Sequence, residues 1–80
     1  MSRPEPAARV DITREVCPMT FVRTKLALEA LEPGQVLEVV LRGEEPRRNV
    51  PRSARDEGHA VLALEPREDG SHVLWLRKGG

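Results

Sequence analysis

The chain has 80 residues, which is the size of one small domain. Thirteen basic residues balance thirteen acidic residues, so there is no overall field to collect nucleic acid or anionic lipid. The one cysteine excludes an intramolecular disulfide, and no apolar run approaches transmembrane length. Because the N-terminus also lacks the apolar core of a signal peptide, these features favour a cytoplasmic protein without membrane contact.

The hydrophobic periodicity and the turn residues predict six elements behind a flexible tail over residues 1–8. In chain order these are a strand over residues 9–13, a helix from Pro18 to about Glu32, a strand over residues 35–42, a charged loop over residues 43–50, a short helix over residues 52–57 opened by Pro51, and strands over residues 59–65 and 71–78. Pro33-Gly34 and Gly58 are expected to end the two helices.

The order β-α-β-α-β-β predicts a two-layer α/β sandwich as a single domain over residues 9–80. The first two strands are joined by a helix and should be parallel, with a right-handed crossover. The last two strands are joined by "PREDG", whose Asp-Gly pair is typical of an antiparallel hairpin. Two helices are therefore expected on one face of a four-stranded mixed sheet.

Two apolar stripes run along the first predicted helix. The stripe expected to face the sheet consists of Phe21, Thr24, Leu28 and Leu31. The second stripe, flanked by Arg23 and Glu29, consists of Val22, Leu26 and Ala30. Both stripes cannot face one flat sheet, so the second lies under a loop, lies partly in solvent, or docks another protein.

Cys17 stands where the first helix begins, directly before Pro18. Helix N–H groups and the helix dipole favour thiolate over thiol there, by about 0.3–1 kcal/mol, which is less than one pKa unit. A lone cysteine is otherwise a small buried hydrophobe, so a structural role stays open beside a reactive one. Cys17, His59 and His72 share no metal-ligand spacing, and no metal site is predicted.

The sequence resembles the TusA/SirA family of small sulfur carriers over about residues 10–80. The block "VCPMTFVRTKLALEALEPGQVLEV" matches the family's Cys-Pro pair, amphipathic helix, Pro-Gly turn and Leu-rich strand. The segments "NVP", "EGHAVL" and "LRKGG" fit later elements of the family pattern in the same order. A Cys-Pro pair alone would be a weak signal, and this order and spacing make it specific.

The resemblance implies that Cys17 carries sulfane sulfur as a persulfide, with no other cofactor. A cysteine desulfurase or a rhodanese would donate the sulfur, and an acceptor protein would take it towards thiolated tRNA, molybdenum cofactor or sulfur oxidation. In this interpretation Pro18 fixes the helix start, and the N–H groups near Met19 and Thr20 support the sulfur anion. The expected partner-docking residues are Val22, Arg23, Lys25, Leu26 and Arg48.

The sequence departs from the family pattern in three places. Thr20 replaces the second proline of Cys-Pro-X-Pro, Arg42-Gly43 replaces an acidic pair, and Asn49 replaces the aspartate of Asp-Ile-Pro. The last two changes lower negative charge in loops that could face a partner. A divergent branch of the family is therefore expected, with its own partners.

Three other functions compete with sulfur carriage on Cys17. The same cysteine could serve a redox-sensing or regulatory protein-interaction module. The terminal Gly79-Gly80 would suit a C-terminal thiocarboxylate, although the order of elements does not fit a ubiquitin-like fold. Arg47, Arg48, Arg52 and Arg55 cluster, but without a stacking aromatic they indicate a solvated surface or a contact for an acidic protein rather than nucleic-acid binding.

Overall fold

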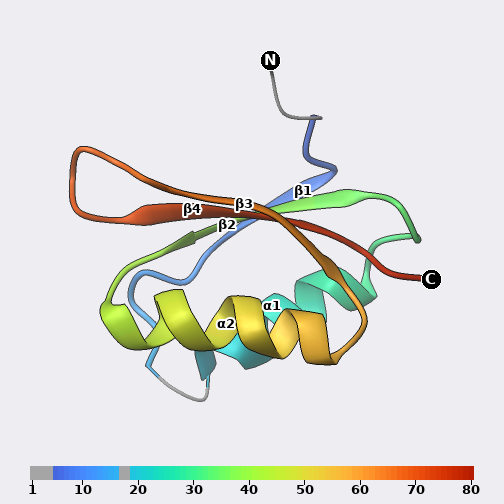
Figure 1. Cartoon of the computed structure of the whole chain (residues 1–80), viewed down its shortest axis with the longest axis horizontal. Helices are drawn as coiled ribbons and strands as arrows, with labels where there is room; N and C mark the ends of the chain where they lie inside the picture. Colours follow the sequence, from blue (N-terminus) through green and yellow to red (C-terminus); the bar gives the residue numbers. More distant parts are fainter. Residues whose placement is uncertain (1–4, 17–18) are drawn as a thin grey trace.

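The computed structural model describes residues 5–16 and 19–80, and its elements follow the predicted order. Their bounds are β1 Ala8–Asp11, α1 Met19–Glu29, β2 Val36–Leu41, α2 Glu44–Asp56, β3 Ala60–Pro66 and β4 His72–Arg77. The four strands form one layer, and both helices lie on the same face of it (Figure 1). The predicted two-layer α/β sandwich is therefore confirmed.

The sheet is mixed and has the strand order β1-β2-β4-β3. β1 and β2 are parallel, as predicted for strands joined by a helix, while β4 is antiparallel to both of its neighbours. Gly70 has φ +91° in the turn between β3 and β4, a backbone conformation that favours glycine and explains the Asp-Gly signal. β4 is inserted between β2 and β3, which leaves β1 and β3 as the two edges.

The first strand begins earlier than the sequence indicated. β1 starts at Ala8, and the N–H of Ala7 donates to the carbonyl of Val36 at 2.7 Å. The predicted boundary of the tail after residue 8 is therefore too late. At the other end β1 stops at Asp11, although Ile12 still donates to the carbonyl of Val40 at 2.8 Å and is buried.

The second helix begins earlier than the sequence predicted. Residues 44–50, predicted as a charged loop, form the first half of α2, and Pro51 lies inside the helix rather than opening it. Gly43 precedes the helix with φ 107°, and Glu44 and Glu45 place negative charge in the first turn, where the helix dipole favours it. A proline in a helix interior removes one hydrogen bond and costs about 3 kcal/mol. Burial of the proline and its neighbours beneath the sheet offsets this cost.

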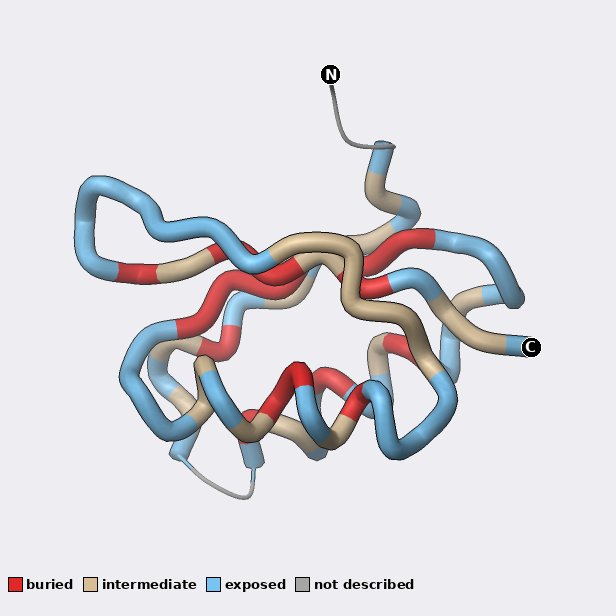
Figure 2. The backbone as a smooth tube through the Cα atoms, viewed as in Figure 1, coloured by how far each residue is buried: buried red, intermediate tan, exposed pale blue. Residues whose placement is uncertain are grey.

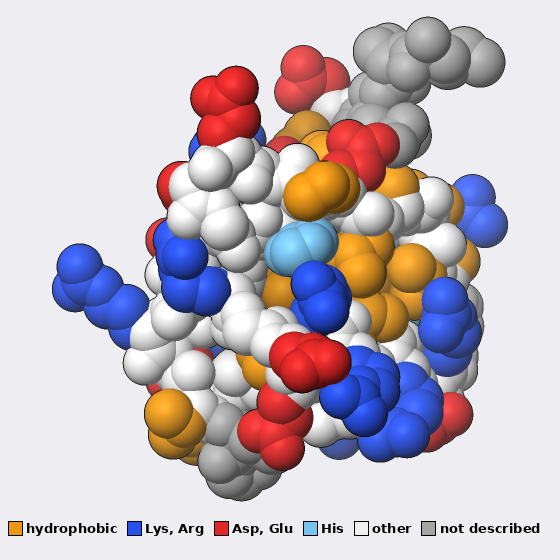
Figure 3. All heavy atoms as spheres, turned by 60° about the vertical axis from the view of Figure 1, so that its left-hand side comes forward, with side chains coloured by type: hydrophobic (Ala, Val, Ile, Leu, Met, Phe, Trp, Pro, Cys, Tyr) orange, Lys and Arg blue, Asp and Glu red, His pale blue; other side chains and the backbone are white. Residues whose placement is uncertain are grey.

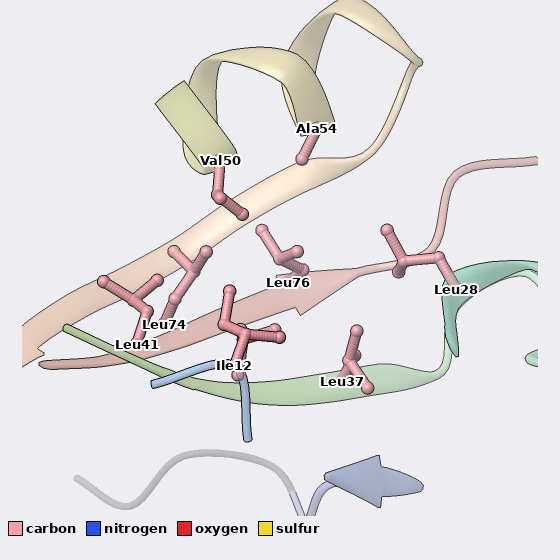
Figure 4. Close-up of a cluster of buried hydrophobic side chains, with 9 residues drawn as sticks. Ile12, Leu28, Leu37, Leu41, Val50, Ala54, Leu74 and Leu76 are labelled. Carbon is pink, nitrogen blue, oxygen red and sulfur yellow. The ribbon is translucent and has the colours of Figure 1, made fainter. Parts of the chain in front are cut away.

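The core lies between the two layers (Figure 2). Its buried members are Ile12, Leu28, Leu37, Val39, Leu41, Val50, Ala54, Leu74 and Leu76. Val50 and Ala54 of α2 point towards Leu74 and Leu76 of β4, and Leu28 enters the same cluster from α1 (Figure 4). Aliphatic side chains thus supply the core, as the composition requires.

Candidate functional site

The segment between β1 and α1 carries the candidate site. Cys17 and Pro18 lie outside the described residues, so the site is described from the residues on either side. The N–H of Glu15 donates to the carbonyl of Ile12 at 3.1 Å, and the N–H of Met19 donates to the carbonyl of Val16 at 2.7 Å. A guanidinium nitrogen of Arg23 lies 3.3 Å from a carboxylate oxygen of Glu15. These contacts join the segment before Cys17 to the start of α1.

Met19 and Thr20 were predicted to support a sulfur anion through their backbone N–H groups. The N–H of Met19 is already used by the carbonyl of Val16, so that donor would have to be shared. Thr20 is buried, with 3% of its surface exposed, and its carbonyl accepts the hydroxyl of Thr24 at 2.9 Å. N–H groups of a first helical turn have no acceptor within the helix, so the amide of Thr20 remains the better candidate for an anion.

The two stripes of α1 separate as their spacing requires. Thr20, Thr24 and Leu28 are buried against the sheet. On the opposite side of the helix, Leu26 (58% exposed), Met19 (42%) and Val22 (39%) face solvent. Together with Val16 (74%), which is exposed in the segment before the helix, they are called the apolar α1 surface. Large apolar side chains on the solvent side of a helix do not stabilise its own fold, so this surface needs another explanation.

Val16 belongs to the apolar α1 surface but was not predicted to do so. It lies in the turn before α1 and therefore escapes a search for helical spacing. An aliphatic side chain in a short connecting segment, with no apolar neighbour at strand spacing, was the signal that could have found it.

The cations predicted to meet a partner are exposed and weakly paired. Lys25 Nζ lies 3.5 Å from Glu57 Oε1. Arg48 Nη2 lies 3.8 Å from Oε2 of Glu44, which is one turn earlier on α2. Exposed pairs of this kind contribute about 0–1 kcal/mol, so an incoming carboxylate can compete for these cations. Arg23 and Lys25 flank the apolar α1 surface, whereas Arg48 stands on the other helix with its own local partner.

Two aspartates close turns beside the sheet. Asp11 accepts from the N–H of Thr13 at 2.9 Å and from its hydroxyl at 2.7 Å, which lowers the pKa of Asp11. Asp69 accepts from the hydroxyl of Ser71 at 2.6 Å and from its N–H at 2.9 Å, which lowers the pKa of Asp69. Hydrogen bonds to the charged form explain both shifts, and both carboxylates serve the backbone of their own turns.

The histidines occupy two different places. His59 Nδ1 accepts from the N–H of Gly79 at 3.0 Å, and His72 Nε2 lies 3.5 Å from a guanidinium nitrogen of Arg47. Among residues 5–16 and 19–80, no three His, Cys, Asp or Glu side chains gather as a metal site would require. In the same ranges no helix is long and apolar enough to cross a membrane.

Comparison with known proteins supports the fold. Residues 8–78 match the family model described as "Sulfurtransferase TusA". A protein of Archaeoglobus fulgidus named "Putative sulfur carrier protein" is 50% identical over 69 residues, covering 86% of this chain and 78% of the relative. A protein of Escherichia coli K12 named "Putative sulfur carrier protein YedF" is 35% identical over 71 residues, covering 89% of this chain and 90% of the relative. The crystal structure of a SirA-like protein from Desulfitobacterium hafniense superposes with a TM-score of 0.79 at 26% identity, covering 91% of this chain and 99% of that one.

Proposed function

Because the chain belongs to the TusA sulfurtransferase family, we propose that it is a sulfur carrier that holds sulfane sulfur as a persulfide on Cys17. In the loading step, the thiolate of Cys17 attacks the terminal sulfur of a persulfide on the donor. The S–S bond of the donor breaks, and its cysteine leaves as a thiolate. In the unloading step a thiolate of the acceptor attacks the same sulfur, and Cys17 is the leaving thiolate. No external oxidant or reductant is needed, because one S–S bond forms as another breaks.

The apolar α1 surface is the observation that carries this proposal. Direct transfer requires the donor and acceptor sulfur atoms to meet Cys17, so each partner must cover the start of α1. Val16 and Met19, the described residues on either side of Cys17-Pro18, are both exposed, and Leu26 continues the surface two turns along. A partner that buries these side chains gains free energy from surface that the carrier leaves in water.

The start of α1 also suits the chemistry of a sulfur anion. The N–H groups of a first helical turn and the positive end of the helix dipole favour a negative charge there, whether it is a thiolate or a persulfide anion. The thiolate is the form that attacks a persulfide sulfur, and it is also the form that leaves when the acceptor takes the sulfur. Thr20, with its buried side chain, fixes the helix start where the family pattern has a second proline.

The proposed donor is a cysteine desulfurase or a rhodanese, and the proposed acceptor is a protein cysteine. Arg23 and Lys25 would orient either partner from the border of the apolar α1 surface, because their own ion pairs are weak. The carrier takes part stoichiometrically, and the persulfide sulfur is its only proposed cofactor. Neither nucleic acid nor membrane takes part in the proposed transfer.

The mass of the intact protein tests this proposal directly. After incubation with a cysteine desulfurase and cysteine, the chain is expected to gain one sulfur atom, which a reducing thiol removes. Cys17→Ser should gain none. Donors from both classes, desulfurases and rhodaneses, should be compared, since the specificity of the docking surface decides which of them loads the carrier.

A redox-sensing module would give a different pattern on the same residue. Its Cys17 would gain oxygen from dilute peroxide as a sulfenic acid and no sulfur from any donor. Rapid oxidation combined with no sulfur gain from either donor class would therefore replace the carrier with the sensor.

A further inference from the structure

Leu26 lies at the middle of the exposed side of α1. At about 100° per residue it points nearly opposite to Thr24, which is buried against the sheet. Met19 and Val22 lie within about 40° of Leu26 on either side of it around the helix axis. Leu26 is also the most exposed large apolar side chain of the helix, at 58%. A molecule that covers the apolar α1 surface therefore meets Leu26 at its centre.

Charged side chains of both signs border this centre. Lys25 and Glu29 lie about 100° and 60° from Leu26 on one side, and Arg23 lies about 60° from it on the other. All three charged side chains are exposed. Lys25 is held only by the exposed pair with Glu57 at 3.5 Å. Within the described part of the chain, Glu29 has no ion pair. One side of the surface therefore offers an unpaired carboxylate beside a weakly paired ammonium group.

This arrangement is self-complementary across a two-fold axis. When two copies of α1 pack antiparallel with Leu26 on the axis, each side of one helix faces the same side of the other. Since each residue rises about 1.5 Å, Lys25 of one copy then lies about 3 Å along the helix axis from Glu29 of the second copy. Symmetry makes two such pairs beside the contact of Leu26 with its own copy. A second copy therefore supplies both the apolar and the charged groups that this surface requires.

The charges of the second helix do not select a strongly charged partner. α2 carries four arginines against three acidic residues, Glu44, Glu45 and Asp56, so its charge is nearly balanced. The face of the molecule shown in Figure 3 likewise mixes basic and acidic side chains around an apolar area. Attraction between two copies is therefore centred on α1.

The size of α1 sets the strength of this contact. The helix has 11 residues and is about 16 Å long. One side of such a helix is smaller than the roughly 800 Å² that each partner buries in a stable complex. Pairing of two α1 helices is therefore expected to be weak and reversible, so that a donor or acceptor can replace the second copy.

We propose that the apolar α1 surface is also the interface of a weak, two-fold symmetric dimer of this chain, formed while no partner protein covers it. The two α1 helices pack antiparallel, Leu26 meets its own copy, and Lys25 pairs with Glu29 of the second copy. The dimer needs no sulfur chemistry and is independent of the proposed function. Only one consequence rests on that function: because a donor must cover Leu26 as well, a dimeric carrier is loaded only after it dissociates.

Sedimentation equilibrium of Cys17→Ser measures the dimer without interference from an intermolecular disulfide. The average mass should rise from that of one chain towards that of two as the concentration passes about 0.1 mM. Backbone NMR signals of residues 19–30 should move over the same concentrations, while those of β3 and β4 stay in place. A chain that remains monomeric up to about 1 mM, or a dimer whose signals move on another surface, would overturn the proposal.

Reversal of single charges tests the pairing itself. In Lys25→Glu both pairs between the copies become repulsive, as they do in Glu29→Lys, so each variant should dimerise about ten-fold more weakly. An equal mixture of the two variants should dimerise about as tightly as the unchanged chain, because both attractive pairs return between unlike copies. Arg67→Glu makes the same change of charge at an exposed position after β3 and should have no effect. No recovery in the mixture, or an equal loss in Arg67→Glu, would contradict the proposed pairing.

Replacement of Leu26 tests the centre of the interface. Covering the exposed part of one leucine contributes a factor of about ten in affinity, and Leu26→Ser removes it from both copies, so the dimer should weaken about a hundred-fold. Leu64→Ser, on β3, should leave the dimer unchanged, and an equal loss in the two variants would remove Leu26 from the interface. Sedimentation needs no sulfur donor, and loading by a donor can be measured on the monomer in dilute solution. Failure of the dimer and failure of sulfur loading are therefore distinguishable.

Discussion

Replacing Leu26 with serine is expected to raise the carrier concentration needed for half-maximal sulfur loading by a desulfurase about ten-fold. Leu26 has 58% of its surface exposed in the free chain. Burying a whole leucine side chain contributes about 1.5–3 kcal/mol, so covering this fraction contributes about 1–1.7 kcal/mol to the complex. Because 1.4 kcal/mol corresponds to a factor of ten in affinity, the expected change is about ten-fold. The free energy of unfolding should change by no more than about 0.5 kcal/mol, since the position faces solvent.

The assay follows the gain of sulfur mass with time at several carrier concentrations. The maximal rate should be unchanged, because the substitution leaves Cys17 and the start of α1 in place, and only half-saturation should move. Leu64→Ser is the matched control, an exposed leucine on β3 away from the apolar α1 surface. Unchanged half-saturation in Leu26→Ser, or an equal shift in both variants, would refute the assignment of this surface to donor docking.

Three further predictions concern stability. Val50→Ala should lower the free energy of unfolding by about 1–3 kcal/mol in thermal or urea denaturation, because Val50 is fully buried and anchors α2. In Gly79→Ala the new methyl group would overlap the carbonyl oxygen of Gly58 and displace the end of the chain. Loss of the hydrogen bond from the N–H of Gly79 to His59 should then lower the free energy of unfolding by about 1 kcal/mol. In Gly80→Ala the methyl group meets no atom, so this control should be neutral. The pKa of Asp69 is lowered in the folded chain, so its contribution to stability is present above about pH 3.9 and is lost as pH falls through the folded pKa. When the free energy of unfolding is measured at decreasing pH, it should therefore fall less steeply in Asp69→Asn than in the unchanged protein. Identical dependence of this free energy on pH in the two proteins would contradict the role of the Asp69 carboxylate.

The helical part of the apolar α1 surface formed by Val22 and Leu26 was accessible to reasoning from the sequence, because a helix has a fixed period. Leu28 and Thr24 fall on one side of α1, and Val22 and Leu26 must then fall on another, whatever the tertiary structure. The sequence left open whether the second stripe was covered by a loop. Exposure of Val22 and Leu26 settles that question in favour of solvent.

The second helix shows where such reasoning failed. Three buried residues in a helix of thirteen, with prolines at positions 46 and 51, leave almost no helical period to detect. Local rules stop a helix at Pro51, and they were outweighed because Val50 and Ala54 can fill the space beneath β4 only if the helix continues through it.

By itself the sequence determined the order of the elements, the parallel pairing of β1 with β2, the hairpin of β3 and β4, and the place of Cys17 before α1. Each of these depends on local signals: periodicity, a proline at a helix start, glycine in tight turns, and the handedness of a β-α-β connection. Only the tertiary structure decided that β4 lies between β2 and β3, that α2 begins at Glu44, and that Leu64 is paired with Leu74 on the helix side of the sheet. These outcomes depend on which apolar surfaces of distant segments are buried against one another. Local sequence patterns do not determine this, because the hydrophobic effect is not directional.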